Sequence, residues 1–414
     1  MTSFNKIDNG RISFLLLAIS LLIGFYFNED ASGGGKGDFY NTWGYNLALQ
    51  KDLLVDPTAW TVHFPLHHII LSRLIYLIED QYLLRLFLCT LSISVPLLFY
   101  LNLKIKFDKV DKNKLLFLAS LIFIIPAFRY SAIWANNHIT ASIFFLLSTL
   151  FFLKWQKKQK NDELSLNVIL NVIFLSLAVY TRQYYALFFL YFMFLYFQKL
   201  KFLTFVKLSL IVLILSLPGF LLVSGQQELL LVTFTNKLAN SILVNSSIIA
   251  FFLIPIFILV FIQNKNLFKD NQKFFYIALI CSIFFVYLLS ILFNYNPSLG
   301  GGFILKLSVL LFNNNFLFYL SVILGFIFFA FLAKEDKNNL VLIMLLVLGF
   351  SAYMIFQKYF EPTFLFLFFL TFNTKISKYF LNDTKNLLFL YIYMTAYLIS
   401  ALVNDIYQIT QRYL

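Results

Sequence analysis

Charged residues are scarce in this chain: only 12% of its 414 residues are Asp, Glu, Lys or Arg. A soluble domain carries about twice that fraction. Cysteine is nearly absent as well. The two present, Cys89 and Cys281, both lie inside apolar runs, where they are expected to be small core residues. These shortages exclude a soluble enzyme, a disordered chain and a small domain held together by disulfides.

What the chain has in abundance is hydrophobic sequence, at 61% of its residues and a mean hydropathy of +0.82. The apolar residues form repeated runs of membrane-spanning length. They predict an all-α polytopic membrane protein, a single integral membrane domain over 1–414 with about thirteen transmembrane helices. The expected span cores are 12–27, 83–103, 115–128, 139–153, 165–180, 184–197, 208–223, 244–262, 274–293, 316–333, 339–355, 362–373 and 387–403.

The net charge of +13 raises the question of a nucleic-acid partner, and the position of the charge answers it. With the N-terminus in the cytoplasm, roughly two thirds of the Lys and Arg residues fall on the inner side, as the positive-inside rule requires. The basic residues therefore set the orientation in an inner (plasma) membrane. The lipid bilayer is the expected partner, and no nucleic acid is expected.

Arginine and histidine are distributed differently from lysine. In this topology all but one of the arginines and all of the histidines are extracytoplasmic: Arg73, Arg85, Arg129, Arg182, Arg412, His63, His67, His68 and His138. The planar guanidinium of arginine suits bidentate binding of phosphate or carboxylate better than the lysine ammonium does. Any chemistry is therefore expected on the outer face.

Residues 28–82 form the longest stretch without a spanning run and are expected to be the first extracytoplasmic loop. Two amphipathic helices are predicted in this loop, over 39–54 and 65–78, lying in the membrane interface. The acidic residues of the loop are Glu29, Asp30, Asp38, Asp52, Asp56, Glu79 and Asp80. A transmembrane core over 83–223, next to the expected site, and a C-terminal transmembrane region over 224–414 complete the chain. Within the latter, glycines 300–302 predict a tight turn before an amphipathic stretch.

The order of features in the first loop carries a resemblance to a known family. Asp38 follows the first span by about ten residues, a Pro65-Leu66-His67 helix comes next, and Leu84-Arg85-Leu86 opens the second span. This order resembles the GT-C superfamily of polyprenyl-phosphate-dependent glycosyltransferases. The resemblance implies a GT-C-like fold and makes Asp38 the position of the catalytic base.

Two shorter segments resemble the same superfamily. Tyr180-Thr181-Arg182-Gln183 is similar to the Arg-Gln-Thr segment of the dolichol-pathway α-1,2-glucosyltransferases, with Tyr184 where that family has Thr. The segment 357–362 is similar to the Arg-Tyr…Pro segment of several such enzymes, protein mannosyltransferase-like ones among them, with Lys358 in place of Arg. The chain departs from the family in two places: Phe64-Pro65 replaces a Pro-Pro pair, and no second acid follows Asp38 directly.

Sugar transfer from a lipid phosphate requires a base for the acceptor hydroxyl and cations for the departing phosphate, both at the membrane face. Asp38 is the expected base. The expected substrate-binding residues, which hold the phosphate or line the sugar, are Arg129, Arg182, Gln183, Lys358, Tyr359, His67, Asn137, His138 and Tyr40. The donor would be a polyprenyl-phosphate sugar and the acceptor a glycan, a lipid or a protein. No cofactor is expected, although the spacing of His63 and His67 leaves a divalent metal open.

Alternatives remain at this stage for the residues and for the function. Asp38 could be one solvated acid among several, and Arg129 and Arg182 could be interfacial anchors. The chain could also be a polymerase or ligase of lipid-linked polysaccharide, although such a protein is expected to carry its large loop late in the chain. A flippase or transporter is a third alternative, which the near absence of charge in the span cores disfavours.

Overall fold

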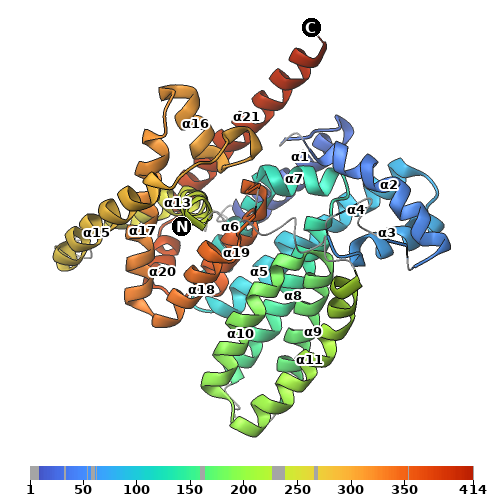
Figure 1. Cartoon of the computed structure of the whole chain (residues 1–414), viewed down its shortest axis with the longest axis horizontal. Helices are drawn as coiled ribbons and strands as arrows, with labels where there is room; N and C mark the ends of the chain where they lie inside the picture. The colour runs from blue at the N-terminus through green and yellow to red at the C-terminus, as the bar shows by residue number, and fades with distance from the viewer. Residues whose placement is uncertain are drawn as a thin grey trace, which may run out of the picture. The chain divides into compact units, whose positions relative to one another are not determined.

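The computed structural model describes residues 9–31, 34–53, 55–56, 61, 63–158, 164–225, 238–264, 269–352 and 354–413, and every regular element within them is helical (Figure 1). The chain divides into two compact units. The first contains Met1–Phe189, Tyr196–Glu228 and Tyr391–Leu414, and the second contains Leu190–Leu195 and Leu229–Leu390.

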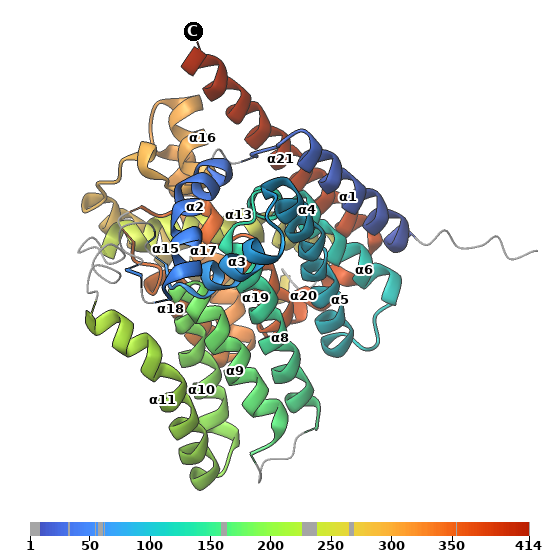
Figure 2. The ribbon, with the colours of Figure 1, turned by 90° about the vertical axis from the view of Figure 1, so that its right-hand side faces the viewer.

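The first unit contains the N-terminal helices and the end of the last one. Its helices are α1 (Asn9–Tyr26), α2 (Gly35–Lys51), α3 (Leu66–Leu77), α4 (Gln81–Ser92), α5 (Ser94–Lys106), α6 (Lys112–Ser120), the 3-10 turn η1 (Leu121–Ile124), α7 (Pro126–Ile133), α8 (Asn137–Lys158), α9 (Leu166–Thr181), the 3-10 turn η2 (Gln183–Tyr185), most of α10 (Ala186–Lys199), α11 (Phe202–Gly225) and, from Tyr391, α21 (Thr384–Tyr413). Both views show α8, α9 and α11 running side by side (Figures 1 and 2).

Buried amides fasten the central helices of this unit. The Asn171 side chain of α9 donates to the Ser148 carbonyl of α8 at 2.9 Å, and Ser148 Oγ donates back to the Asn171 carbonyl at 3.0 Å. Asn102 of α5 donates to the carbonyl of Leu146 in the same way, at 3.0 Å. Where lipid tails are as apolar as leucine, such interhelical hydrogen bonds and close packing hold helices together.

The chain bends sharply between η1 and α7. Pro126 is the first residue of α7, and its missing N–H cannot continue the preceding helix. The axes of 112–124 and 126–133 therefore meet at 68°. All eight residues of α7 are buried, so this short helix packs inside the protein.

The second unit is built around α13 (Leu238–Gln263). Its other helices are α15 (Gln272–Ile291), the 3-10 turn η3 (Pro297–Leu299), α16 (Gly302–Phe312), α17 (Phe316–Glu335), α18 (Lys337–Leu348), the 3-10 turn η4 (Gln357–Tyr359), α19 (Thr363–Leu370), α20 (Lys375–Asn382) and the start of α21. At Gly325 a Cβ would come within 2.9 Å of the Ser246 carbonyl, so glycine lets α17 lie close against α13.

Eight helices of the described residues are long and apolar enough to cross a membrane, or ten if each of two bent pairs counts as one span. The chain is therefore a multi-pass membrane protein, and the count of about thirteen spans stays a prediction. Three of the predicted spans coincide with α9, α10 and α18, which have 16, 14 and 12 residues. Length alone keeps them out of the count of eight, since 16 residues at about 1.5 Å each rise ~24 Å, against the ~30 Å of a hydrocarbon core.

Both helices predicted in the first loop are present, as α2 and α3. The first begins at Gly35, because Asp30 accepts hydrogen bonds from the N–H groups of the residues that open it. The second follows Pro65, and Asp80 then caps α4 by accepting from Leu83 N at 2.8 Å. One expectation was wrong: Cys281 of α15 is exposed rather than a core residue.

Candidate functional site

The short turn between α7 and α8 is the centre of the candidate site, which is built from residues of the first unit. Ala135 adopts a left-handed conformation (φ 51°), and Asn136 N donates to the Ser131 carbonyl at 2.8 Å. A left-handed alanine is sterically unfavourable, so the surrounding contacts must hold it there. The turn places the side chains of Asn136 and Asn137 at the start of α8.

Asp38 lies in the first turn of α2 and is half-buried. Asn136 Nδ2 donates a hydrogen bond to Asp38 Oδ2 at 3.2 Å. The Asn136 Oδ1 accepts from the backbone N–H of His138 at 3.3 Å, which fixes the orientation of the amide. A carboxylate in the first turn of a helix is also stabilised by the helix dipole. Asp38 therefore stands in a defined position and not as one solvated acid among several.

Arg182 lies at the end of α9, and only 2% of it is exposed. Its Nη1 donates to Asn137 Oδ1 at 2.6 Å, and its guanidinium carbon lies 5.1 Å from the centre of the Tyr184 ring. Consecutive asparagines thus connect the predicted base with the predicted phosphate-binding arginine. Burial of a guanidinium among polar side chains is uncommon and marks a candidate functional site.

His67 of α3 holds the same turn from the opposite side. Because a carbonyl can only accept, His67 Nε2 donates to the Ala135 carbonyl, at 3.0 Å. The other nitrogen of the neutral ring, Nδ1, then accepts from the Thr140 hydroxyl at 2.9 Å. Burial, together with the neighbouring His68 and Arg182, holds the pKa of His67 well below its usual value. A neutral His67 with both nitrogens engaged positions the turn and is poorly placed to exchange protons with a substrate.

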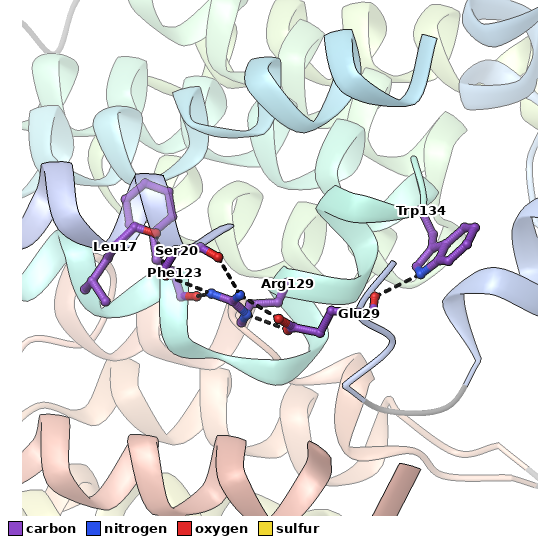
Figure 3. Close-up of polar contacts among 6 residues, drawn as sticks. All are labelled: Leu17, Ser20, Glu29, Phe123, Arg129 and Trp134. Carbon is purple, nitrogen blue, oxygen red and sulfur yellow. Dashed lines mark hydrogen bonds and ion pairs between the residues drawn. The ribbon is translucent and has the colours of Figure 1, made fainter. Parts of the chain in front are cut away.

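Arg129, the other predicted phosphate-binding arginine, is engaged by the protein itself (Figure 3). It donates to both carboxylate oxygens of Glu29, from Nε at 2.6 Å and from Nη2 at 2.7 Å. Its remaining three N–H groups donate to the Ser20 hydroxyl, the Ser20 carbonyl and the Phe123 carbonyl. These contacts use all five N–H donors of the guanidinium. As placed here, Arg129 has none left for a phosphate.

The Glu29–Arg129 pair requires a glycine beside it. A Cβ on Gly24 would lie 2.5 Å from Glu29 Oε2 and 2.7 Å from an Arg129 nitrogen. The Glu29 carbonyl also accepts from Trp134 Nε1 at 2.9 Å, so Glu29 binds both the middle of α7 and the residue that ends it. The pair therefore supports the turn that carries Asn136.

Aromatic rings from α2 and from the residue that ends α7 lie close together. The guanidinium carbon of Arg85 lies 3.6 Å from the centre of the Trp134 ring, and the exposed ring of Tyr40 lies 6.1 Å from it. His138, 3% exposed, has its ring 6.5 Å from that of Tyr130. Of these rings only that of Tyr40 is exposed, so Tyr40 is the one that can meet the apolar face of a sugar.

Gln183, Lys358 and Tyr359 are the remaining predicted residues. Gln183 Oε1 and His63 Nδ1 are 3.2 Å apart, which joins η2 to the first loop. Lys358 and Tyr359 belong to η4 of the second unit, where the Lys358 ammonium lies 5.3 Å from the centre of the Phe356 ring. In the part of the chain that the structure describes, no group of three or more His, Cys, Asp or Glu residues could hold a metal ion.

The sequence prediction missed Asn136, Thr140 and the role of Glu29. Asn136 was within reach of it, because it directly precedes the predicted residue Asn137. Glu29 was counted among the loop acids, but nothing in the local sequence connects it with Arg129. No family model, no curated protein and no solved structure matches the chain.

Proposed function

We propose that the chain is a GT-C-type glycosyltransferase of the inner membrane, with a cytoplasmic N-terminus and an extracytoplasmic site. It would transfer a sugar from a polyprenyl-phosphate donor to a hydroxyl of a glycan, a lipid or a protein. One observation carries this proposal: Asn136 and Asn137, adjacent in sequence, hydrogen-bond to Asp38 at 3.2 Å and to Arg182 at 2.6 Å. The Asp38 carboxylate and the Arg182 guanidinium are thereby bound by neighbouring residues of one turn.

Asp38 is the base in this proposal. Its carboxylate accepts the proton of the acceptor hydroxyl while the hydroxyl oxygen forms a bond to the anomeric carbon. The bond between that carbon and the phosphate oxygen breaks, and the polyprenyl phosphate leaves with the electron pair. A single displacement of this kind inverts the anomeric centre. The hydrogen bond from Asn136 orients the carboxylate.

Arg182 stabilises the departing phosphate in this proposal. Its charge is held in a buried site at the end of α9, where an interaction with a second charge is stronger than in water. The exposed ring of Tyr40 would cover an apolar face of the sugar. Arg129, engaged by Glu29, supports the turn and leaves the phosphate to Arg182.

The proposal is tested in cells that lack the gene, by mass spectrometry of their polyprenyl-phosphate sugars. Accumulation of one donor is expected, and wild-type protein should reverse it. Asp38→Asn should fail to reverse it while reaching the membrane in normal amounts. Asp52→Asn, an exposed acid at the end of the same helix, is the matched control and should complement fully. Full complementation by Asp38→Asn, or no change in any donor on deletion, would overturn the proposal.

A further inference from the structure

The start of α16 in the second unit has an unusual environment. Gly300, Gly301 and Gly302 precede and open the helix with φ angles of 120°, 82° and 79°. A Cβ on Gly302 would lie 2.6 Å from a carbon of Ile248, and a Cβ on Gly300 would lie 2.5 Å from the Ile355 carbonyl oxygen. The glycines therefore let this end of the helix sit deep in the unit without side chains of its own covering its first N–H groups.

Gln357 of η4 reaches into this helix end. Its Oε1 accepts from the backbone N–H of Phe303 at 2.6 Å, and because a backbone N–H can only donate, the orientation of the amide is settled. The amide nitrogen therefore lies at the same helix end. Gln357 is only 8% exposed, and its Nε2 has no hydrogen-bond partner among the described residues. A buried donor without a partner is rare in folded proteins and calls for an explanation.

These donors and the helix end together suit an anion. The first N–H groups of a helix have no partner within the helix, and its dipole favours negative charge there. Gly301 N and Phe303 N are already bonded, to the Ile355 carbonyl and to Gln357. Gln357 Nε2 adds a donor from the side, and the next residue, Lys358, adds a positive charge to the same segment. Phosphate accepts from several donors at once and fits such a set.

The other end of α16 indicates what the phosphate is attached to. Leu310, Leu311 and Phe312, in the last turn, are 80%, 60% and 50% exposed. Eleven residues at about 1.5 Å each rise ~16 Å, close to half of a ~30 Å hydrocarbon core. A lipid chain lying along α16 would thus meet apolar side chains after its phosphate has met the N–H groups.

We propose that the N-terminal end of α16 and the Gln357 amide bind the phosphate group of a membrane lipid. The residues of this site all belong to the second unit, and the proposal holds whether or not the chain transfers sugars. The test uses full-length protein in detergent. Short-chain phosphatidic acid is the probe, the diacylglycerol with the same chains is the probe without phosphate, and inorganic phosphate is the probe without lipid.

The decisive variant is Gln357→Glu. A carboxylate keeps the oxygen that accepts from Phe303 N, so the helix stays capped, but it loses the Nε2 donor and adds a negative charge facing the phosphate. We expect at least tenfold weaker binding of phosphatidic acid, together with a lower thermal unfolding temperature, because the new carboxylate is buried. Gln272→Glu, at the exposed first residue of α15, lowers the net charge equally and should bind as wild type does.

Three results would overturn the inference. The first is wild-type protein that binds the diacylglycerol as tightly as phosphatidic acid. The second is Gln357→Glu protein that binds phosphatidic acid with wild-type affinity, or Gln272→Glu protein that loses binding to the same extent. The third is inorganic phosphate that binds as tightly as the lipid, which would leave an anion site but remove the lipid from the proposal.

Discussion

Arg129 and Glu29, one hundred residues apart in the sequence, meet in a bidentate ion pair with nitrogen–oxygen distances of 2.6 and 2.7 Å. The pair is largely buried, with 5% and 13% of the two side chains exposed. It joins the end of α1 to the helix that leads into the Asn136 turn. Arg129 was predicted to bind a phosphate. In the structure its guanidinium binds Glu29.

The first prediction concerns this pair. Arg129→Gln leaves the Glu29 carboxylate buried without its cation and should lower the free energy of unfolding by about 3–5 kcal/mol. Thermal unfolding in detergent measures the change. The matched control is Lys157→Ala, which breaks the exposed Lys157–Asp108 pair, with 57% and 54% of its side chains exposed, and should not shift the transition measurably. Equal shifts in the two variants would contradict the assignment of Arg129 as a structural residue.

The second prediction separates Arg182 from Arg129 by activity. Arg182→Ala should reduce transfer roughly ten- to a hundredfold, because a hydrogen bond to a charged partner contributes about 1.5–3 kcal/mol. Arg182→Lys keeps the charge, loses the planar fork and should lie between this variant and wild type. Initial rates with donor varied in washed membranes give both values. If both variants turn over as wild type does, Arg182 does not bind the donor phosphate.

A third prediction is a dependence of stability on pH. Burial lowers the pKa of His68 to about 4, against about 6.5 in an unfolded chain. Between these values the unfolded state binds a proton that the folded state does not, so stability falls as pH is lowered from 6.5 to 4 and levels off below. The difference corresponds to about 3 kcal/mol. His68→Gln cannot titrate and should lose less stability over this window, with His67 supplying the remainder. Unfolding temperatures from pH 7 to pH 4 test this, and an identical slope in both proteins would refute it.

The fourth prediction is the orientation in the membrane. In a background with both native cysteines replaced, Lys36→Cys and Lys158→Cys each expose a thiol at a helix end. A membrane-impermeant maleimide added to intact cells should label the first and not the second, because the charge distribution places the N-terminus inside. Permeabilised cells should show both labelled, which serves as the control. Labelling of the second alone would put the Asp38 turn on the cytoplasmic face.

Local sequence could predict the elements better than their pairing. The apolar runs and Pro65 indicated the helices of the first loop, because amphipathicity and turn chemistry act over a few residues. The apolar runs alone do not give the number of membrane spans. Hydropathy does not distinguish a side chain that faces lipid from one that faces protein, and all eight apolar or small residues of α19 are buried within the protein.

In the candidate site, too, the residues could be predicted better than the contacts between them. Asp38, Asn137 and Arg182 could each be chosen by residue type and by position near a span end. Their connection through Asn136 depends on the left-handed Ala135 and on His67, which no local pattern reveals. The partner of Arg129 lay among several acids of the first loop, and only the folded chain selects Glu29.

The separation of Glu29 and Arg129 along the chain also affects how the protein is made. At about 5–20 residues per second, the ribosome needs roughly 5–20 s to synthesise the hundred residues between them. During that interval α1 has already left the translocon with a carboxylate at its end and no cation to meet it. The Glu29–Arg129 pair can therefore form only after α7 has been made, so the contact of α1 with α7 is completed later than the synthesis of the apolar helix Gln81–Lys106.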